Sequence, residues 1–456
     1  MATTTAVADV PARGGGGRSV RAWHVLAVLF LLWMVSFLDR GVLALLVTPI
    51  RADLGLSDFD LSLLQGFSFA LCYAIAGLPI GWMVDRFPRR PIIFVGITIW
   101  ALATAGSGLA TSFGQLFFAR MLVGIGEATL SPAGYSLLTD VFPRRRLSLA
   151  ISVAAMGGAL GAGLAYMVSG LILELGRSGL LDLPGIGHLQ PWQQVFMIIG
   201  LPGLLIGLLV FTFAEPVRRG GEEGVKRVRE GGDDAASSMR FFFAHLRRHG
   251  RFYACHIGGF ATFSIANYGF QAWAAEYMRR AFGWSAMEIG ATFGPALSIA
   301  VFGAYAVGGL VVDRLFDRGM KDAHLRVFFW FAIASIPLSA ATLLTGNPWT
   351  FLVLSTVWGL FSISFGGAAA AALQITTPPQ FRGRISSIYL LVIVLLGMTV
   401  GPSSVAALTQ FVFADEASLG AALLCLMAVV YPLGAALLAG GMKPMRAIIA
   451  AGETAR

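Results

Sequence analysis

Twelve long apolar stretches run along this chain, and they constrain its fold more than any other feature. Each is long enough to cross the roughly 30 Å hydrocarbon core of a bilayer as a helix. Apolar residues make up 57% of the chain and charged residues only 12%, about half their usual share in soluble proteins. The sequence therefore predicts an all-α membrane protein with twelve transmembrane helices. The predicted spans are 22–49, 60–84, 91–110, 115–141, 147–173, 193–214, 252–276, 286–312, 323–345, 349–376, 385–411 and 418–440.

Basic residues are distributed unevenly between the two sides of this predicted bundle. With the N-terminus inside, 27 of them fall in inner segments, and only four fall in outer loops: Arg51, Arg177, Arg279 and Arg280. Such a bias sets the orientation of membrane proteins, because positively charged loops stay in the cytoplasm. We therefore expect a multi-pass plasma or bacterial inner membrane protein with both termini cytoplasmic. The net charge of +9 then needs no nucleic-acid partner.

An internal repeat divides the chain into two halves. Three residues at the inner end of the second span recur, with an offset of 228, at the inner end of the eighth: Gly81, Asp85 and Arg86 become Gly309, Asp313 and Arg314. Parallel six-helix repeats are typical of rocker-type secondary transporters, whose site lies between the halves. The expected segments are a cytoplasmic tail (1–21), an N-terminal six-helix half (22–214), a cytoplasmic linker with an interfacial helix (215–251), a C-terminal six-helix half (252–440) and a cytoplasmic tail (441–456).

Four charged residues lie well inside their apolar spans, away from the ends: Asp39 and Arg40 in the first span, and Arg120 and Glu127 in the fourth. Charges at membrane depth cost several kcal/mol and mark functional sites by default. Arg120 and Glu127 are seven residues apart on one helix face, which we expect to line a cavity with Ser131 beyond. The alternative is a buried structural set of ion pairs, Asp39 with Arg120 and Arg40 with Glu127, that fixes helix packing without titrating.

The charged positions of the first half become neutral in the second. Offsets of 228 and 235 map Asp39 onto Asn267, Arg40 onto Tyr268 and Glu127 onto Ser362. We therefore expect the N-terminal half to carry the proton and charge chemistry, and the C-terminal half to offer hydrogen bonds and aromatic surface. The candidate substrate-binding residues are Arg40, Arg120, Ser131, Asn267, Tyr268, Gln271, Trp358 and Ser362.

A conformational latch is predicted where the second span meets the third. Glycine permits close helix approach, an aspartate can meet a helix dipole, and arginines can pair with carboxylates across the interface between the halves. The alternative interpretation is a set of ordinary positive loop charges. The latch candidates are Gly81, Asp85, Arg86, Arg89 and Arg90, with Asp313 and Arg314 in the second half.

The pattern G-x-x-x-D-R-x-x-R-R, in twelve spans with a central linker, resembles the major facilitator superfamily over the whole chain. Two further segments, Phe37-Leu38-Asp39-Arg40 and Arg120-x-x-x-Gly124-x-Gly126-Glu127-Ala128, are similar to Spinster-type transporters, including bacterial homologues. The resemblance implies proton-linked, alternating-access transport of lysophospholipids or sphingosine-phosphate-like lipids. It implies Asp39 and Glu127 as protonation candidates and Arg40 as a gating or headgroup-binding residue.

Two other transport functions remain as alternatives, whereas the sequence argues against an ATP-driven pump and against an enzyme. Related organic-anion transporters carry similar charges in the first and fourth spans, so a proton-linked carrier of small soluble organic or phosphorylated anions is an alternative, as is an uncoupled lipid scramblase. None of the three lysines lies in a P-loop, and no catalytic Ser/His/Asp or Cys/His set shares one depth. We expect no enzyme activity and no cofactor. The expected partners are an amphiphilic anion, protons and membrane lipids, with the protein as a monomer.

Overall fold

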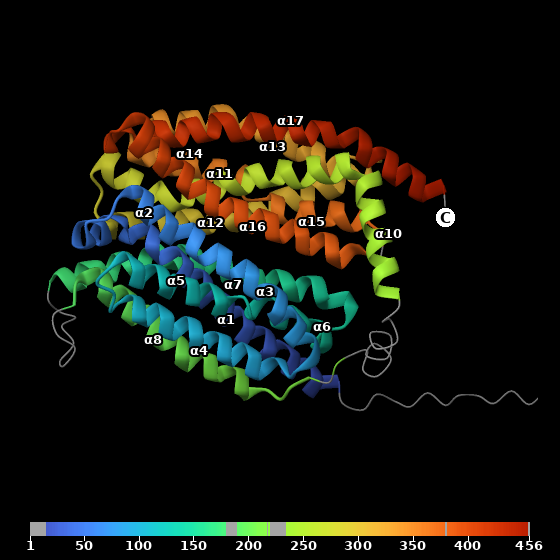
Figure 1. Ribbon diagram of the computed structural model, residues 1–456, viewed down its shortest axis with the longest axis horizontal. Helices are drawn as coiled ribbons and strands as arrows, with labels where there is room; N and C mark the ends of the chain where they lie inside the picture. The colour runs from blue at the N-terminus through green and yellow to red at the C-terminus, as the bar shows by residue number, and fades with distance from the viewer. Residues whose placement is uncertain (1–14, 179–188, 217, 219–233, 379–380, 455–456) are drawn as a thin grey trace, which may run out of the picture.

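The computed structural model describes residues 15–178, 189–216, 218, 234–378 and 381–454, and most of these residues are helical (Figure 1). Residues 1–14 of the predicted N-terminal tail, and 217 and 219–233 of the predicted linker, lie outside the described residues. The first half contains α1 (Gly15–Leu54), α2 (Asp58–Ser62), η1 (Leu63–Phe67), α3 (Ser68–Arg86), α4 (Arg89–Ser107), α5 (Phe113–Glu127), α6 (Leu130–Val141), α7 (Arg144–Arg177), α8 (Pro191–Leu208) and η2 (Leu209–Thr212).

The second half follows a helix, α10 (Asp234–Arg248), that lies across one end of the bundle. We call this end the linker end and the opposite one the distal end. The helices of the second half are α11 (Gly250–Phe282), α12 (Ala286–Asp317), α13 (Ala323–Leu344), α14 (Pro348–Ser362), α15 (Phe365–Thr376), α16 (Arg382–Ala407), η4 (Leu408–Phe413), η5 (Glu416–Ser418) and α17 (Leu419–Thr454).

The helices confirm the predicted all-α membrane architecture. Among the described residues, ten helical segments are long and apolar enough to cross a membrane. The broken pair α5–α6 and the helix α11 lie beside them and complete the twelve predicted spans. The first and last helices of the chain extend beyond their predicted spans. Helix α1 begins at Gly15, and α17 continues to Thr454.

The two halves repeat one packing scheme and lie one above the other in Figure 1. In the first half, α1 packs against α7, and α4 packs against α5 and α8. In the second half, α11 packs against α16, and α13 packs against α14 and α17. These helices correspond in order, so the predicted pseudo-symmetric halves are confirmed.

The halves touch closely toward the distal end. On the η1 turn, a Cβ atom at Gly66 would lie 1.7 Å from the carbonyl oxygen of Met398 on α16. Where α7 crosses α12, a Cβ atom at Gly163 would lie 2.6 Å from the carbonyl oxygen of Gly294. Only glycine allows backbones to approach this closely. The distal contact between the halves is therefore backbone against backbone.

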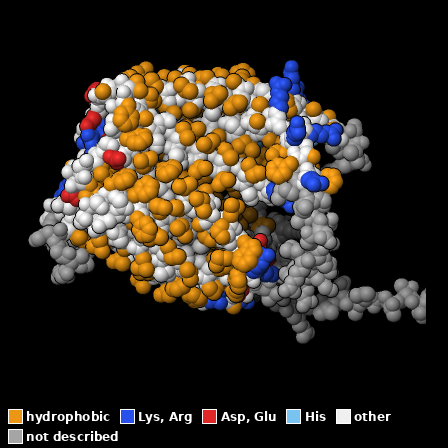
Figure 2. All heavy atoms as spheres, in the orientation of Figure 1, with side chains coloured by type: hydrophobic (Ala, Val, Ile, Leu, Met, Phe, Trp, Pro, Cys, Tyr) orange, Lys and Arg blue, Asp and Glu red, His pale blue; other side chains and the backbone are white. Residues whose placement is uncertain are grey.

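The linker end is open between the halves. Gly81 and Gly309 occupy equivalent positions there, and no described atom lies within 4 Å of the place that a Cβ atom would take at either. Figure 2 shows the surface hollowed between the two halves near this end. The molecule is thus closed at the distal end and open at the linker end.

Candidate functional site

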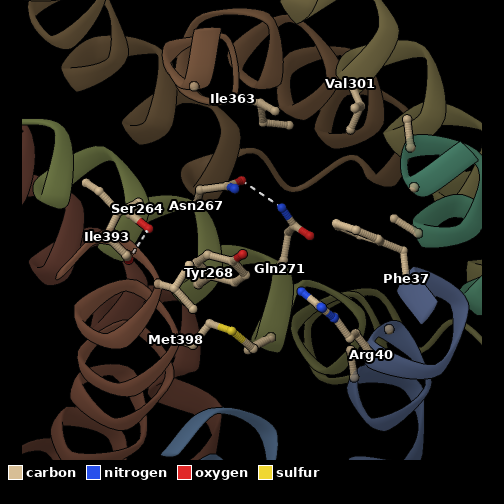
Figure 3. Close-up of a pocket in the computed structure, with 18 of the residues that line it drawn as sticks. Phe37, Arg40, Ser264, Asn267, Tyr268, Gln271, Val301, Ile363, Ile393 and Met398 are labelled. Atoms are coloured by element: carbon tan, nitrogen blue, oxygen red, sulfur yellow. Dashed lines mark hydrogen bonds between the residues drawn. The ribbon is translucent and has the colours of Figure 1, made fainter. Parts of the chain in front are cut away.

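A cavity of about 380 Å³ lies between the two halves (Figure 3). Its wall has a polar part, which includes Arg40, Gln65, Ser131, Asn267, Tyr268 and Gln271 together with the hydroxyl-bearing Tyr73, Tyr135, Tyr166 and Ser264. Its apolar part includes Trp33, Leu43, Val301, Ile363, Ile393 and Met398. Both halves contribute to both parts, so a molecule in this cavity would contact both at once.

Arg40 on α1 supplies the cation of the cavity wall. Its guanidinium carbon lies 4.9, 4.8 and 5.2 Å from the ring centroids of Phe37, Phe69 and Tyr73. Its Nε donates a hydrogen bond of 2.5 Å to Oε2 of Glu127. The side chain is 18% exposed, whereas that of Glu127 is fully buried. Arg40 therefore faces the cavity while its carboxylate partner lies behind it.

Figure 3 shows Arg40 extending toward Tyr268 and Gln271 from the other half. The side-chain amide of Gln271 donates a hydrogen bond of 2.8 Å to the side-chain oxygen of Asn267. Ser264 donates to the backbone carbonyl of Ile393 at 2.8 Å. The C-terminal half therefore presents neutral polar groups opposite the cation, as predicted from the internal repeat.

Glu127 ends α5 at a break in the fourth span. Besides Arg40, the hydroxyl of Ser36 donates to its Oε2 at 2.7 Å. The chain turns after this residue, and the hydroxyl of Thr129 donates to the carbonyl of Gly126 at 2.8 Å. The break places a carboxylate at membrane depth beside the first span, where two donors stabilise its charge.

The second half breaks at the equivalent position. Ser362 ends α14, and the hydroxyl of Ser364 donates to the carbonyl of Phe361 at 3.2 Å. The offset of 235 that pairs Glu127 with Ser362 also pairs Thr129 with Ser364. The two breaks are therefore one repeated feature, and the internal alignment drawn from the sequence matches it.

Asp39 points into the N-terminal half instead of the cavity. The hydroxyl of Thr104 donates to its Oδ2 at 2.7 Å, and Nη1 of Arg120 lies 3.8 Å from its Oδ1. The side chains of Asp39 and Arg120 are each only 2% exposed. The four buried charges thus form the two pairs that the structural alternative named, Asp39 with Arg120 and Arg40 with Glu127.

The remaining candidates divide between the cavity and the helix core. Ser131, Asn267, Tyr268 and Gln271 line the cavity together with Arg40. Arg120 lies behind the wall, and Trp358 donates to the hydroxyl of Tyr431 at 2.9 Å inside the C-terminal half. Ser362 and Trp358 instead border a small adjoining pocket, which Asn267 and Gln271 also border.

Gln65 and Tyr73 line the cavity although neither was predicted. Gln65 lies on the π-helical turn η1, and its side-chain amide is buried without a hydrogen-bond partner among the described residues. Such turns are common at functional sites because they rotate side chains out of the regular helix register. In the sequence, the only indication of a role for Gln65 was a side-chain amide within an apolar span.

The arginines of the predicted latch, Arg89 and Arg90, make contacts within the first half. Nε of Arg89 lies 2.8 Å from Oε1 of Glu215, and Nη1 of Arg89 pairs with Asp140. Arg90 donates to the backbone carbonyl of Val210 at 2.9 Å. In this conformation, with the linker end open, these arginine contacts do not cross to the second half. Asp85 and Arg86 are exposed.

Charge pairs instead join the halves at the distal end. Arg280 on α11 lies 2.9 Å from Asp58 on α2 of the other half, and 2.5 Å from Glu276 of its own helix. Arg51 on α1 pairs with Glu416 on η5. We call Arg51, Asp58, Glu276, Arg280 and Glu416 the distal gate. It contains two of the four arginines that the charge distribution left on this side.

Sequence comparison decides the family. The sequence pattern of the Major Facilitator Superfamily matches residues 29–402. The chain belongs to the major facilitator superfamily. This superfamily member is 27% identical over 425 residues to an MFS-type efflux pump of Mycolicibacterium smegmatis, with 91% of each chain covered. It is 25% identical to the probable galactarate/D-glucarate transporter GudP of Bacillus subtilis, with 81% of each covered.

The resemblance to Spinster is also found among solved structures. The chain superposes with a TM-score of 0.71 and 25% identity on a bacterial homologue of the human lysosomal transporter Spinster in an inward-facing, occupied conformation. The match covers 95% of this chain and 97% of that one. The predicted family resemblance is thereby confirmed, and this superfamily member is a transporter, not an enzyme.

Proposed function

We propose that this protein is a proton-coupled secondary transporter of amphiphilic anions, such as lysophospholipids or sphingosine-phosphate-like lipids. The observation that carries the proposal is the division of the cavity wall into a polar part around Arg40 and an apolar part. A guanidinium binds phosphate or carboxylate through two parallel hydrogen bonds, and the apolar wall accommodates a hydrocarbon chain. An amphiphilic anion uses both parts.

Proton coupling follows from the pairing of Arg40 with Glu127. The 2.5 Å bond between them engages the guanidinium that an anionic headgroup needs. A proton on Glu127 weakens that bond and makes Arg40 available to the substrate. Asp39, in the pair behind, is the second proton-coupling candidate because its charge stabilises Arg120. Proton and substrate are then coupled through the arginines.

The transport cycle alternates between closure at the two ends. We assign the linker end to the cytoplasm from the basic residues, so the conformation described is inward-facing. The distal gate holds this state closed to the outside. When the linker end closes, Asp85 and Arg86 with their counterparts Asp313 and Arg314 form the latch. The protein acts as a monomer in the bacterial inner membrane.

A carrier of small soluble anions is the second candidate, supported by the 25% identity to the probable galactarate/D-glucarate transporter. Each hydroxyl of such a substrate requires a hydrogen-bond partner, and one left unpaired in a dry site costs about 1–3 kcal/mol. The apolar part of the wall offers no such partners. The cavity therefore favours amphiphiles over polyhydroxylated acids.

A ligand panel tests the substrate class on purified protein in detergent. We expect lysophosphatidylglycerol and sphingosine 1-phosphate to raise the melting temperature, because a ligand at 100 times its Kd stabilises the folded state by about 2.7 kcal/mol. Lysophosphatidylcholine, which lacks the net negative charge, is the control for detergent-like effects. Stabilisation by D-galactarate alone would contradict the lipid assignment and support the second candidate.

Replacing Asp39 with asparagine tests coupling separately from binding. Asn267 already occupies the equivalent position in α11, and an amide oxygen still accepts the hydrogen bond from Thr104. We therefore expect intact folding and substrate binding, with loss of uphill uptake driven by a pH gradient. Glu127→Gln should show a weaker loss of the same kind. Calorimetry measures affinity, and proteoliposomes with and without a gradient measure uptake. Full accumulation in Asp39→Asn would show that Asp39 only partners Arg120.

A further inference from the structure

The helix α10 presents an exposed surface that the transport mechanism does not use. It forms the last part of the linker (215–251) and precedes α11, with His249 at the turn. Figure 1 shows α10 lying across the linker end, at a steep angle to the spanning helices. A helix in this position lies close to the plane of the membrane surface.

One face of α10 is fixed to the C-terminal half. Phe242 is buried, with its ring centroid 5.6 Å from that of Phe381 and 5.6 Å from the guanidinium carbon of Arg384. Nε2 of His245 lies 2.9 Å from the hydroxyl of Tyr253 on α11. These contacts position the helix, and they leave the opposite face uncovered by the described residues.

The opposite face combines exposed aromatic and basic side chains. Phe241 and Phe243 are 69% and 59% exposed, although phenylalanine gains from burial. Ala244 lies at the centre of this face, and its helical neighbours three and four residues away are Arg240, Phe241, Arg247 and Arg248, all exposed. Figure 2 shows Lys and Arg side chains gathered over this end of the molecule. We call this face the α10 outer face.

We propose that the α10 outer face binds anionic phospholipid headgroups of the leaflet at the linker end. Phenylalanines beside arginines suit the boundary between headgroups and acyl chains, where the rings enter the chains and the guanidiniums bind phosphates. From Met239 to Arg251 the sequence contains four arginines and no acidic residue. Charge complementarity therefore favours an anionic lipid surface over a zwitterionic one.

The histidines of this segment do not supply the charge near neutral pH. Burial lowers the pKa of His245, and the neighbouring His249 and Arg248 lower it further. Burial and Arg248 also lower the pKa of His249. Both rings are therefore neutral at pH 7, since the ordinary value is about 6.5. The attraction to lipid comes from the arginines.

A spin label at Ala244→Cys, in the full chain with Cys72, Cys255 and Cys425 replaced, reports the surroundings of this face. The protein is placed in nanodiscs of phosphatidylcholine, with or without phosphatidylglycerol. Collision with oxygen detects lipid, and collision with a water-soluble nickel complex detects water. We expect high oxygen and low nickel accessibility only when phosphatidylglycerol is present.

A charge reversal with a matched control sharpens the test. Arg247→Glu should restore nickel accessibility in the phosphatidylglycerol discs, since each basic residue at an anionic surface contributes roughly a fivefold factor in partitioning. Arg318→Glu, the same change at another exposed arginine of the linker end, should have no effect.

Three results would overturn the proposal. Water accessibility in both kinds of disc shows a solvated helix. Exclusion of both quenchers shows that protein covers the face. Equal lipid accessibility in both kinds of disc, unchanged by Arg247→Glu, shows membrane contact through the phenylalanines alone.

Discussion

Arg40→Ala is expected to lower transport by an order of magnitude or more while the protein still inserts into the membrane. The change removes the cation of the cavity wall and leaves the buried carboxylate of Glu127 without its partner at 2.5 Å. Removing one partner of a buried ion pair costs roughly 3–5 kcal/mol. Arg40→Lys should restore only part of the activity, because an ammonium lacks the planar pair of donors. Uptake into proteoliposomes measures the effect.

A double variant separates a substrate role of Arg40 from a purely structural one. Arg40→Ala combined with Glu127→Gln removes both charges of the pair, so the unpaired carboxylate no longer destabilises the fold. If Arg40 binds the headgroup, this variant should regain thermal stability and still fail to bind an anionic amphiphile. Near-normal transport by Arg40→Ala, or recovery of binding in the double variant, would refute the role.

Glu276→Gln is expected to shift the protein away from the conformation that is closed at the distal end. Glu276 accepts a hydrogen bond of 2.6 Å from Thr48 of the other half and pairs with Arg279 and Arg280. The ion pairs of Glu276 lie within α11 and act on closure by holding Arg280 against Asp58 of the other half. We assign about 2 kcal/mol, the lower end of the usual range for charge pairs across an interface, to the weakened contacts with Thr48 and Asp58. That free energy corresponds to a roughly 30-fold shift in the ratio of the two conformations.

Spin labels at Gly114→Cys and Gly346→Cys measure this shift. Both glycines are exposed at the distal end, Gly114 in the first turn of α5 and Gly346 in the loop before α14, and a Cβ atom at either has no neighbouring atom within 4 Å outside its own helix. We expect a longer-distance population in Glu276→Gln. Glu174→Gln is the matched control, since Glu174 is exposed and pairs only with Arg177 of its own helix, whereas Glu276 also accepts a hydrogen bond from the other half. An unchanged distance distribution would show that the distal gate does not set the equilibrium.

The architecture and the charged residues at the centre of the site could be predicted from the sequence. Apolar stretches report span length directly. The repeat identified Asn267 and Tyr268 as the counterparts of Asp39 and Arg40, and both line the cavity with Arg40. Charged residues are rare at membrane depth, so the few that occur there could be paired from the sequence. The pair of Arg40 with Glu127 belongs to the structural interpretation of these charges.

The distal gate was not predictable in the same way. Asp58, Glu276 and Glu416 lie in separate segments, and each resembles an ordinary polar residue near a span end. Whether these residues contact each other depends on which end of the molecule is closed. That is a property of the conformation, and a local sequence pattern does not indicate it. The position of Gln65 also required the π-helical turn, since one added residue per turn changes the direction of a side chain.

The empty space beside Gly81 and Gly309 affects how variants of this protein should be judged. A larger side chain at either position fits the conformation that is open at the linker end without a clash, so a thermal melt or an expression screen on that form would score it as harmless. The same side chain would stand between the halves whenever the linker end closes. Damage of this kind is invisible to measurements of folding and becomes evident only when the protein has to complete a cycle.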